Sequence, residues 1–144
     1  MQIKELKLTK TDDLITATPE MMLTDASHLL ADNNIGALLV VDEAGQMVGI
    51  LSERDIIRSF AENAATLAEH TVAELMTRDV ISCDETEDLN DVMELMSERK
   101  IRHVPVMSGG KLKSILSTRD GLSAMLHDVR EHFENINLAY ETVR

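Results

Sequence analysis

The chain has few cysteines, prolines and aromatic residues. Its 144 residues include one cysteine, two prolines, two phenylalanines, one tyrosine and no tryptophan. A single cysteine, Cys83, excludes an internal disulfide, and no set of cysteines and histidines has the spacing of a zinc site. We therefore expect a reducing compartment, the cytoplasm. The shortage of aromatic rings also argues against recognition of single-stranded nucleic acid by base stacking.

Positive charge and long apolar runs are also scarce. Fourteen Lys and Arg residues stand against 26 Asp and Glu residues, so the formal net charge is -12. Such an acidic surface argues against wrapping nucleic acid or docking on anionic lipid. The longest apolar run, residues 37–41, is five residues long, whereas a membrane span needs about 20. Residues 1–20 carry several charges and no long apolar run, so we expect no signal peptide.

The chain does contain an internal repeat with an offset of about 65 residues. The segment GILSERD at residues 49–55 matches SILSTRD at residues 114–120, and five of the seven positions are identical. Further pairs match upstream: NIGALLVVDEAG (34–45) with KIRHVPVMSGG (100–110), and LITATPE (14–20) with VISCDET (80–86).

Each copy has the pattern of strand, helix, strand, strand, helix. Apolar residues recur at helical spacing between the first two strands, and short apolar runs flank a glycine-containing turn before the last helix. The predicted strands are 15–18, 37–41 and 47–51 in the first copy, and 80–83, 104–107 and 111–116 in the second. One copy has about 55 residues, which makes a poor core on its own. We therefore predict an α+β fold in which two repeats pack sheet to sheet.

The repeat also divides the chain. We assign residues 1–66 to the first repeat, residues 67–130 to the second and residues 131–144 to a helical extension. An alanine-rich stretch at residues 61–71 is predicted to be a helical linker. In the extension and just before it, apolar residues recur every three or four positions, from Val129 to Tyr140. This stripe is expected to pack on the body of the protein or on a partner chain.

The order of elements and the motif Gly-apolar-apolar-Ser-x-x-Asp resemble the CBS domain, and the two copies resemble a CBS pair, or Bateman module. IRHVPV at residues 101–106 is typical of the family before its second strand. The resemblance covers nearly the whole chain. It implies a stand-alone sensory module, not an enzyme, that binds an adenosine-containing ligand such as AMP, ADP, ATP or S-adenosylmethionine between the copies. It also implies a disc-like homodimer that signals to a separate, unidentified protein.

The Ser-x-x-Asp motif has two interpretations. Ser52 with Asp55, and Ser117 with Asp120, have the spacing of a helix capping box, which by itself would explain both copies. The resemblance implies instead that the aspartate accepts hydrogen bonds from ribose hydroxyls. Both interpretations are compatible, because a helix N-terminus also attracts phosphate.

Basic residues distinguish the two copies. Arg54 and Arg119 lie in the first turn of a predicted helix, where a cation is unfavourable for the helix dipole; phosphate binding or a surface salt bridge would explain them. A basic cluster that includes Arg102 and His103 occurs in the second copy only, because the matching residues 33–37 carry no charge. We therefore expect the second cleft to be better equipped for a phosphate chain. Alternatively, the cluster offsets surrounding acids at a dimer face.

Apolar residues are expected to form the walls around the adenine, although they are also plain core positions. The candidates are Ile15, Thr16 and Ala17, then Ile81, Ser82 and Cys83, with Leu38 and Val104 opposite and with Pro105 and Thr118 beside them. Cys83 is expected to be a small buried filler and not a reactive thiol.

The copies depart from each other at three strand positions that bear on the clefts. Leu39 stands where the second copy has Pro105, and Ser114 and Lys113 stand where the first copy has glycine and valine. The serine and the lysine are expected to narrow or polarise one cleft. We expect no catalytic residue, no metal site and no required cofactor beyond a regulatory adenine nucleotide. The alternatives are a ligand-free dimeric scaffold, or a sensor of NADH or S-adenosylmethionine.

Overall fold

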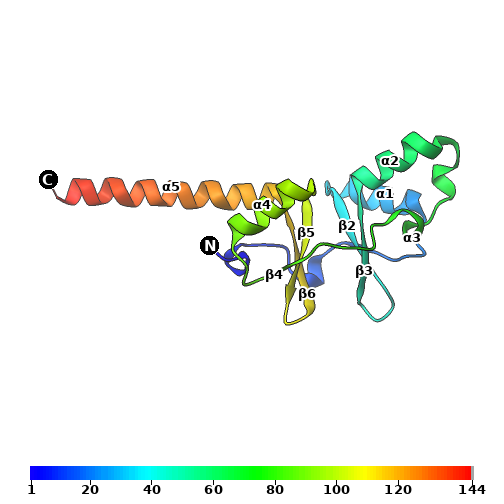
Figure 1. Ribbon diagram of the computed structural model, residues 1–144, viewed down its shortest axis with the longest axis horizontal. Helices are drawn as coiled ribbons and strands as arrows, with labels where there is room; N and C mark the ends of the chain where they lie inside the picture. Colours follow the sequence, from blue (N-terminus) through cyan, green and yellow to red (C-terminus); the bar gives the residue numbers. More distant parts are fainter. Residues whose placement is uncertain (144) are drawn as a thin grey trace.

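The computed structural model describes residues 1–143 and contains two three-stranded sheets (Figure 1). In each sheet the first strand pairs parallel with the second, and the second pairs antiparallel with the third. The strands are β1 (Thr16–Ala17), β2 (Ala37–Val41) and β3 (Met47–Ser52) in the first sheet, and β4 (Cys83–Asp84), β5 (His103–Ser108) and β6 (Lys111–Ser117) in the second. The predicted α+β fold with two similar repeats is confirmed.

The longer helices begin where the capping patterns predict. Ser52 and Ser117 each accept a hydrogen bond from the backbone N–H three residues later, and Asp55 and Asp120 close both capping boxes. The α-helices are α1 (Leu23–Asp32), α2 (Glu53–Asn63), α3 (Val72–Leu75), α4 (Leu89–Arg99) and α5 (Thr118–Thr142). Short 3₁₀ helices are η1 (Ile3–Glu5), η2 (Thr11–Asp13) and η3 (Ala64–Glu69).

Two predicted boundaries are corrected. The first strands of the two repeats shrink to two residues each, because β1 and β4 pair with their neighbours at two positions only. The predicted linker helix at 61–71 is only partly α-helical, since α2 ends at Asn63 and 3₁₀ turns follow to Glu69. The last helix, α5, runs without a break from Thr118 to Thr142, so residues 131–142 extend it as predicted. Within residues 1–143 no helix is both long and apolar enough for a membrane crossing.

Each repeat has its own core, between its sheet and its helices. Alternate residues of the central strands, Leu38 and Val40 in β2 and Val104 and Val106 in β5, are buried in these two cores. The residues between them, such as Leu39, lie on the opposite face of the sheet because successive side chains of a strand point to opposite faces. That face is turned toward the other repeat.

The entry segments of the two repeats are exchanged. Ile3 is 1% exposed and packs in the core of the second repeat, where its N–H donates to the carbonyl of Glu87 at 3.0 Å. Val72 and Met76 pack in the core of the first repeat, and the Val72 N–H donates to the carbonyl of Met21 at 2.8 Å. The entry segment of each repeat therefore packs in the core of the other, and the two repeats are interlocked.

Candidate functional site

A cavity of about 1060 Å³ lies between the two repeats. The first repeat contributes apolar wall residues that include Ile15 and Leu39, and Ile115 comes from the second. The volume is slightly above the range for small-molecule sites, which is about 300–1,000 Å³. Seven of the predicted site residues line it: Ile15, Arg102, His103, Ser117, Thr118, Arg119 and Asp120.

Asp120 lines this cavity with one carboxylate oxygen free. Its Oδ2 accepts hydrogen bonds from the hydroxyl of Ser117 at 2.8 Å and from the Ser117 N–H at 3.3 Å. Its Oδ1 accepts no hydrogen bond from any residue between 1 and 143. Capping and ligand contact would therefore use different oxygens, and the two interpretations of the motif do not compete at this position.

Two arginines lie near Asp120, and only one of them is in an ion pair. Arg102 donates to Glu53 Oε1 at 2.8 Å, an ion pair that joins the second repeat to the first. Arg119, in the first turn of α5, makes no ion pair within the described part of the chain. Its guanidinium is therefore available for an anion, and planar guanidinium donors match phosphate oxygens well.

His103 is largely enclosed between the repeats. Its ring lies so close to Gly36 that a Cβ on this glycine would be 2.9 Å from Cε1, which explains why no side chain is present there. Burial, reinforced by the positive charge of Arg102, lowers the pKa of His103, while Glu53 and Asp120 act in the opposite direction. The neutral ring that burial favours offers one hydrogen-bond donor and one acceptor to the cavity.

The matching Asp55 lies outside this cavity. Its Oδ2 accepts from the hydroxyl and the N–H of Ser52, at 3.0 and 2.9 Å, as in the other motif. Its Oδ1, however, accepts a hydrogen bond from Thr77 Oγ1 at 3.4 Å. Two backbone hydrogen bonds between Thr77 and Ile50, at 2.8 and 3.0 Å, hold the threonine beside the aspartate. Asp55 instead borders a smaller hollow of about 490 Å³ among residues of α2 and α3.

The two arginines of the motifs also differ. Arg54 donates from Nη1 to the carbonyl of Lys100 at 2.7 Å, at the left-handed residue that ends α4. This bond ties α2 of the first repeat to α4 of the second. It is neither of the two roles expected from the sequence, a phosphate contact or a salt bridge. Only tertiary structure brings Arg54 to this carbonyl, which is 46 residues away in sequence.

The residues that line the cavity differ from the predicted walls. Leu38 and Val104 are fully buried in the two repeat cores and do not line the cavity, and Leu39 and Ile115 line it instead. The reason is strand alternation, since a shift of one residue exchanges the faces of a sheet. The other predicted residues that do not line the cavity are Thr16, Ala17, Ser52, Arg54, Asp55, Ile81, Ser82, Cys83 and Pro105.

Cys83 has the role expected of it. The side chain is 3% exposed and packs in the core of the second repeat. Burial, with the nearby negative charges of Glu87 and Asp84, raises the pKa of the Cys83 thiol to about 11. The thiolate is the reactive form, so this cysteine is chemically inert at neutral pH.

Ser114 and Lys113, which were predicted to narrow or polarise one cleft, line a smaller hollow of about 350 Å³ and not the large cavity. Ser114 donates its hydroxyl to the carbonyl of Thr9 at 2.6 Å, and Lys113 forms an ion pair with Glu85. Thr9 lines both this smaller hollow and the large cavity. Among residues 1–143, no group of three or more histidine, cysteine or acidic side chains is arranged to hold a metal ion.

Solved structures share this architecture. The CBS-domain containing protein ATU1752 from Agrobacterium tumefaciens is 31% identical, with a TM-score of 0.80 over 87% of this chain and 99% of that one. The CBS domain pair of MJ0100, in complex with 5′-methylthioadenosine and S-adenosyl-L-methionine, is 32% identical, with a TM-score of 0.75 over 89% and 97%. CBSX2 in complex with AMP is 25% identical, with a TM-score of 0.75 over 88% and 97%.

Curated relatives differ in length from this chain. A protein from Acidianus ambivalens is 31% identical over 117 residues, which are 81% of this chain and 70% of the relative. The chain spans only 33% of a relative from Thermofilum pendens, at 41% identity. The CBS domain matches residues 3–62 and again residues 72–127. These two matches coincide with the two structural repeats and cover most of the sequence, so the chain belongs to the CBS domain family as a tandem pair.

Proposed function

We propose that this chain is a regulatory module that binds an adenosine-containing ligand, AMP, ADP or ATP, in the cavity between its repeats. The observation that carries the proposal is the free Oδ1 of Asp120, which borders a nucleotide-sized cavity opposite an apolar wall from the other repeat. Two similar structures support the ligand class, since CBSX2 is in complex with AMP and the MJ0100 pair with 5′-methylthioadenosine and S-adenosyl-L-methionine.

The lining residues suit the three parts of a nucleotide. Ile15, Leu39 and Ile115 offer an apolar surface to a purine, and Asp120 offers an acceptor to ribose hydroxyls. Arg119, in the first turn of α5, offers its guanidinium to phosphate. The N–H groups of Thr118 and Asp120 in this turn already donate to the Arg102 carbonyl and the Ser117 hydroxyl. No step of this scheme requires a catalytic residue, so we propose a binding protein and not an enzyme.

Regulation follows from where the cavity lies. A ligand that contacts both repeats binds more tightly when they are correctly spaced, and it therefore shifts the population toward that arrangement. We propose that this shift is passed to a separate protein. We also propose that the pair forms a homodimer and that it acts in the cytoplasm, where a free thiol such as Cys83 stays reduced.

The test compares the two aspartates. We expect calorimetry with AMP, ADP, ATP and S-adenosylmethionine to show at least one saturable ligand with one site per chain. Asp120→Ala should weaken that ligand at least tenfold. Asp55→Ala is the matched control, because it removes the same capping interaction from the other repeat while leaving the cavity intact.

Two results would contradict this proposal. Failure of all four compounds to bind at millimolar concentration would eliminate the adenosine-type ligand. Equal losses of affinity in Asp120→Ala and Asp55→Ala would show that the aspartates act through capping alone.

A ligand-free dimeric scaffold is the second candidate, and the apolar side chains exposed along α5 favour it. A sensor of NADH or S-adenosylmethionine would use the same cavity. Thermal unfolding separates these functions, because a ligand that binds only the folded protein raises its Tm. A scaffold with empty clefts would show no rise with any of these compounds.

A further inference from the structure

The second half of α5 projects from the protein without contacting the rest of it (Figure 1). Every residue from Leu126 to Val143 is exposed. Most helical stability in proteins comes from packing of an apolar face. This segment has such a face and nothing in the described chain covers it, so the helix needs a partner.

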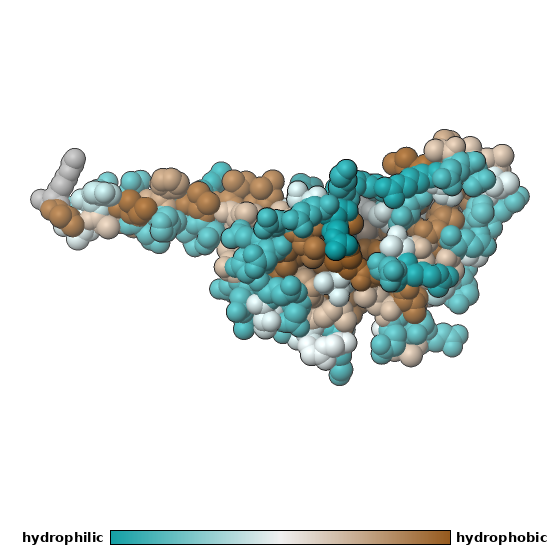
Figure 2. All heavy atoms as spheres, viewed as in Figure 1, coloured by the Kyte–Doolittle hydropathy of each residue, from teal (hydrophilic) through white to brown (hydrophobic). Residues whose placement is uncertain are grey.

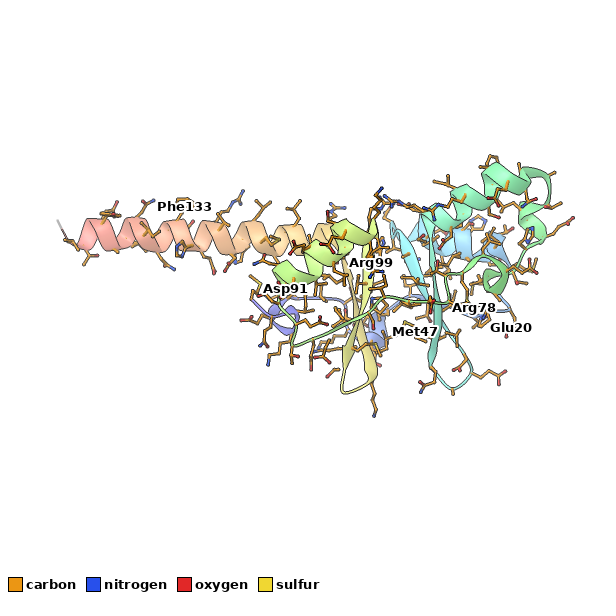
Figure 3. All side chains as sticks on the ribbon, viewed as in Figure 1. Glu20, Met47, Arg78, Asp91, Arg99 and Phe133 are labelled. Atoms are coloured by element: carbon orange, nitrogen blue, oxygen red, sulfur yellow. The ribbon has the colours of Figure 1, made fainter. Side chains whose placement is uncertain are left out.

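The apolar face follows a heptad pattern. Seven apolar side chains recur at alternating intervals of four and three residues, and each is between 38% and 88% exposed. This 3.5-residue repeat is that of the a and d positions of a coiled-coil seam. Figure 2 shows the apolar side chains along the projecting helix, and Figure 3 labels Phe133 among them. The seam residues are Leu122, Leu126, Val129, Phe133, Ile136, Tyr140 and Val143.

The charges are arranged around this seam. With Leu126 and Val129 as the a and d positions, every acidic residue between 126 and 143 falls at an outer position, b, c or f. The positions that flank the seam, e and g, carry no acid. In a chain with a net charge of -12, this arrangement leaves the seam free of the repulsion that acidic flanks would cause between two copies. The flanking residues from 130 onward are Arg130, His132, Asn137 and Ala139.

We propose that α5 pairs with α5 of a second copy as a parallel, in-register, two-stranded coiled coil. In this register the partner's Arg130 faces Met125, and the partner's Asn137 faces His132, so no like charges meet. An antiparallel register that places Leu126 opposite Ile136 would bring the two Arg130 side chains together at its centre. The inference deepens the proposed homodimer and is independent of ligand binding. Most of the seam lies beyond residue 127, where the CBS domain match ends.

Sedimentation equilibrium of the full chain tests the seam. We expect a dimer, and we expect Ile136→Glu to weaken it at least tenfold because a charge would be buried at a d position. Leu138→Glu is the matched control, since Leu138 is also apolar and exposed, at 61%, but lies at an outer position. A monomeric wild-type chain, or a dimer that Ile136→Glu leaves unchanged, would overturn the proposal.

Cross-linking tests the orientation. In the parallel register, an Ile136→Cys variant brings its new cysteine against the same residue of the partner and should form a disulfide-linked dimer on oxidation. The native Cys83 is buried and does not compete. A dimer that does not cross-link would overturn the parallel arrangement. Calorimetry with AMP on Ile136→Glu reports on the ligand cavity separately, so failure of the coiled coil and failure of the proposed ligand site can be distinguished.

Discussion

The two Ser-x-x-Asp motifs have the same local structure and different surroundings. In both, the serine hydroxyl and the aspartate close a capping box at the start of a helix. Asp120 borders the cavity between the repeats with a free oxygen, whereas the second oxygen of Asp55 accepts from Thr77. Repeated sequence therefore reproduces a helix cap, and the neighbouring segment decides whether the same aspartate is open to a ligand.

The neighbouring segments are the exchanged entry segments. Thr77 pairs with Ile50 of β3, directly beside Asp55. The equivalent Thr11 donates its hydroxyl to the carbonyls of Leu112 and Lys113, earlier in β6 and away from Asp120. The first entry segment is also three residues longer, because seven residues separate IKEL (3–6) from Leu14 and four separate VAEL (72–75) from Val80. The edge of β6 near the motif is therefore left open, while the equivalent edge of β3 is covered.

Truncation of the adjacent leucines in β2 should give the largest change in stability. It also distinguishes a core residue, Leu38, from a residue of the cavity wall, Leu39. We expect Leu38→Ala to lower the free energy of unfolding by about 2–5 kcal/mol, because it leaves a void in the core of the first repeat. Leu39 is also buried, at 2% exposed, but it lines the cavity, so Leu39→Ala should change ligand affinity as well as stability. Urea unfolding and calorimetry of both variants check this. Equal stability losses with unchanged affinity would contradict the assignment of Leu39 to the cavity wall.

Exchange of the residues at the start of the two motifs should have an intermediate effect. Gly49→Ser places a Cβ 2.7 Å from Met76 Sδ and 3.0 Å from the carbonyl of Thr77, and we expect a loss of about 1–3 kcal/mol from overpacking. Ser114→Gly removes the hydroxyl that donates to Thr9, with an expected loss of about 1 kcal/mol. Thermal unfolding measures both. If Met76→Ala does not reduce the loss caused by Gly49→Ser, overpacking against Met76 is not its cause.

The pH dependence of stability should show the smallest effect. Burial holds the pKa of His103 below the value of about 6.5 that a histidine has in the unfolded chain. The stabilising contribution of the neutral ring is therefore complete above pH ~6.5 and is lost as the pH falls toward the lower folded-state pKa. His103→Ala introduces the residue that the first repeat has at this position, Ala37, and should reduce the difference in urea midpoint between pH 7.5 and pH 5.5.

The control for this measurement is His28→Ala, which removes an exposed histidine from α1. A wild-type pH difference that persists in full in His103→Ala would show that other groups cause it.

The sequence predicted the cavity wall of the second repeat better than the apolar wall of the first repeat. The wall from the second repeat follows from the motif and the basic cluster, because Arg102, His103 and Asp120 are close in sequence to one strand end and one helix start. For the apolar wall, Leu38 was predicted, whereas the adjacent residue Leu39 lines the cavity. Successive side chains of β2 point to opposite faces of the sheet, so either set of alternate residues could face the cavity. Both sets are apolar because both faces of this sheet are covered, and the sequence therefore does not show which set faces the cavity.

Local chemistry determined much of this protein from the sequence alone: the duplicated pattern, the helix starts, the α+β class and the apolar stripe of α5. These features depend on the spacing of residues within short segments, because that spacing determines local hydrogen bonds and which side chains share a buried face. Tertiary structure alone decided which aspartate is free, because Thr77 lies 22 residues from Asp55. The position of Arg54 against Lys100 has the same origin. Contacts between distant segments depend on how the entry segments cross between the repeats, and no spacing within either copy specifies that crossing.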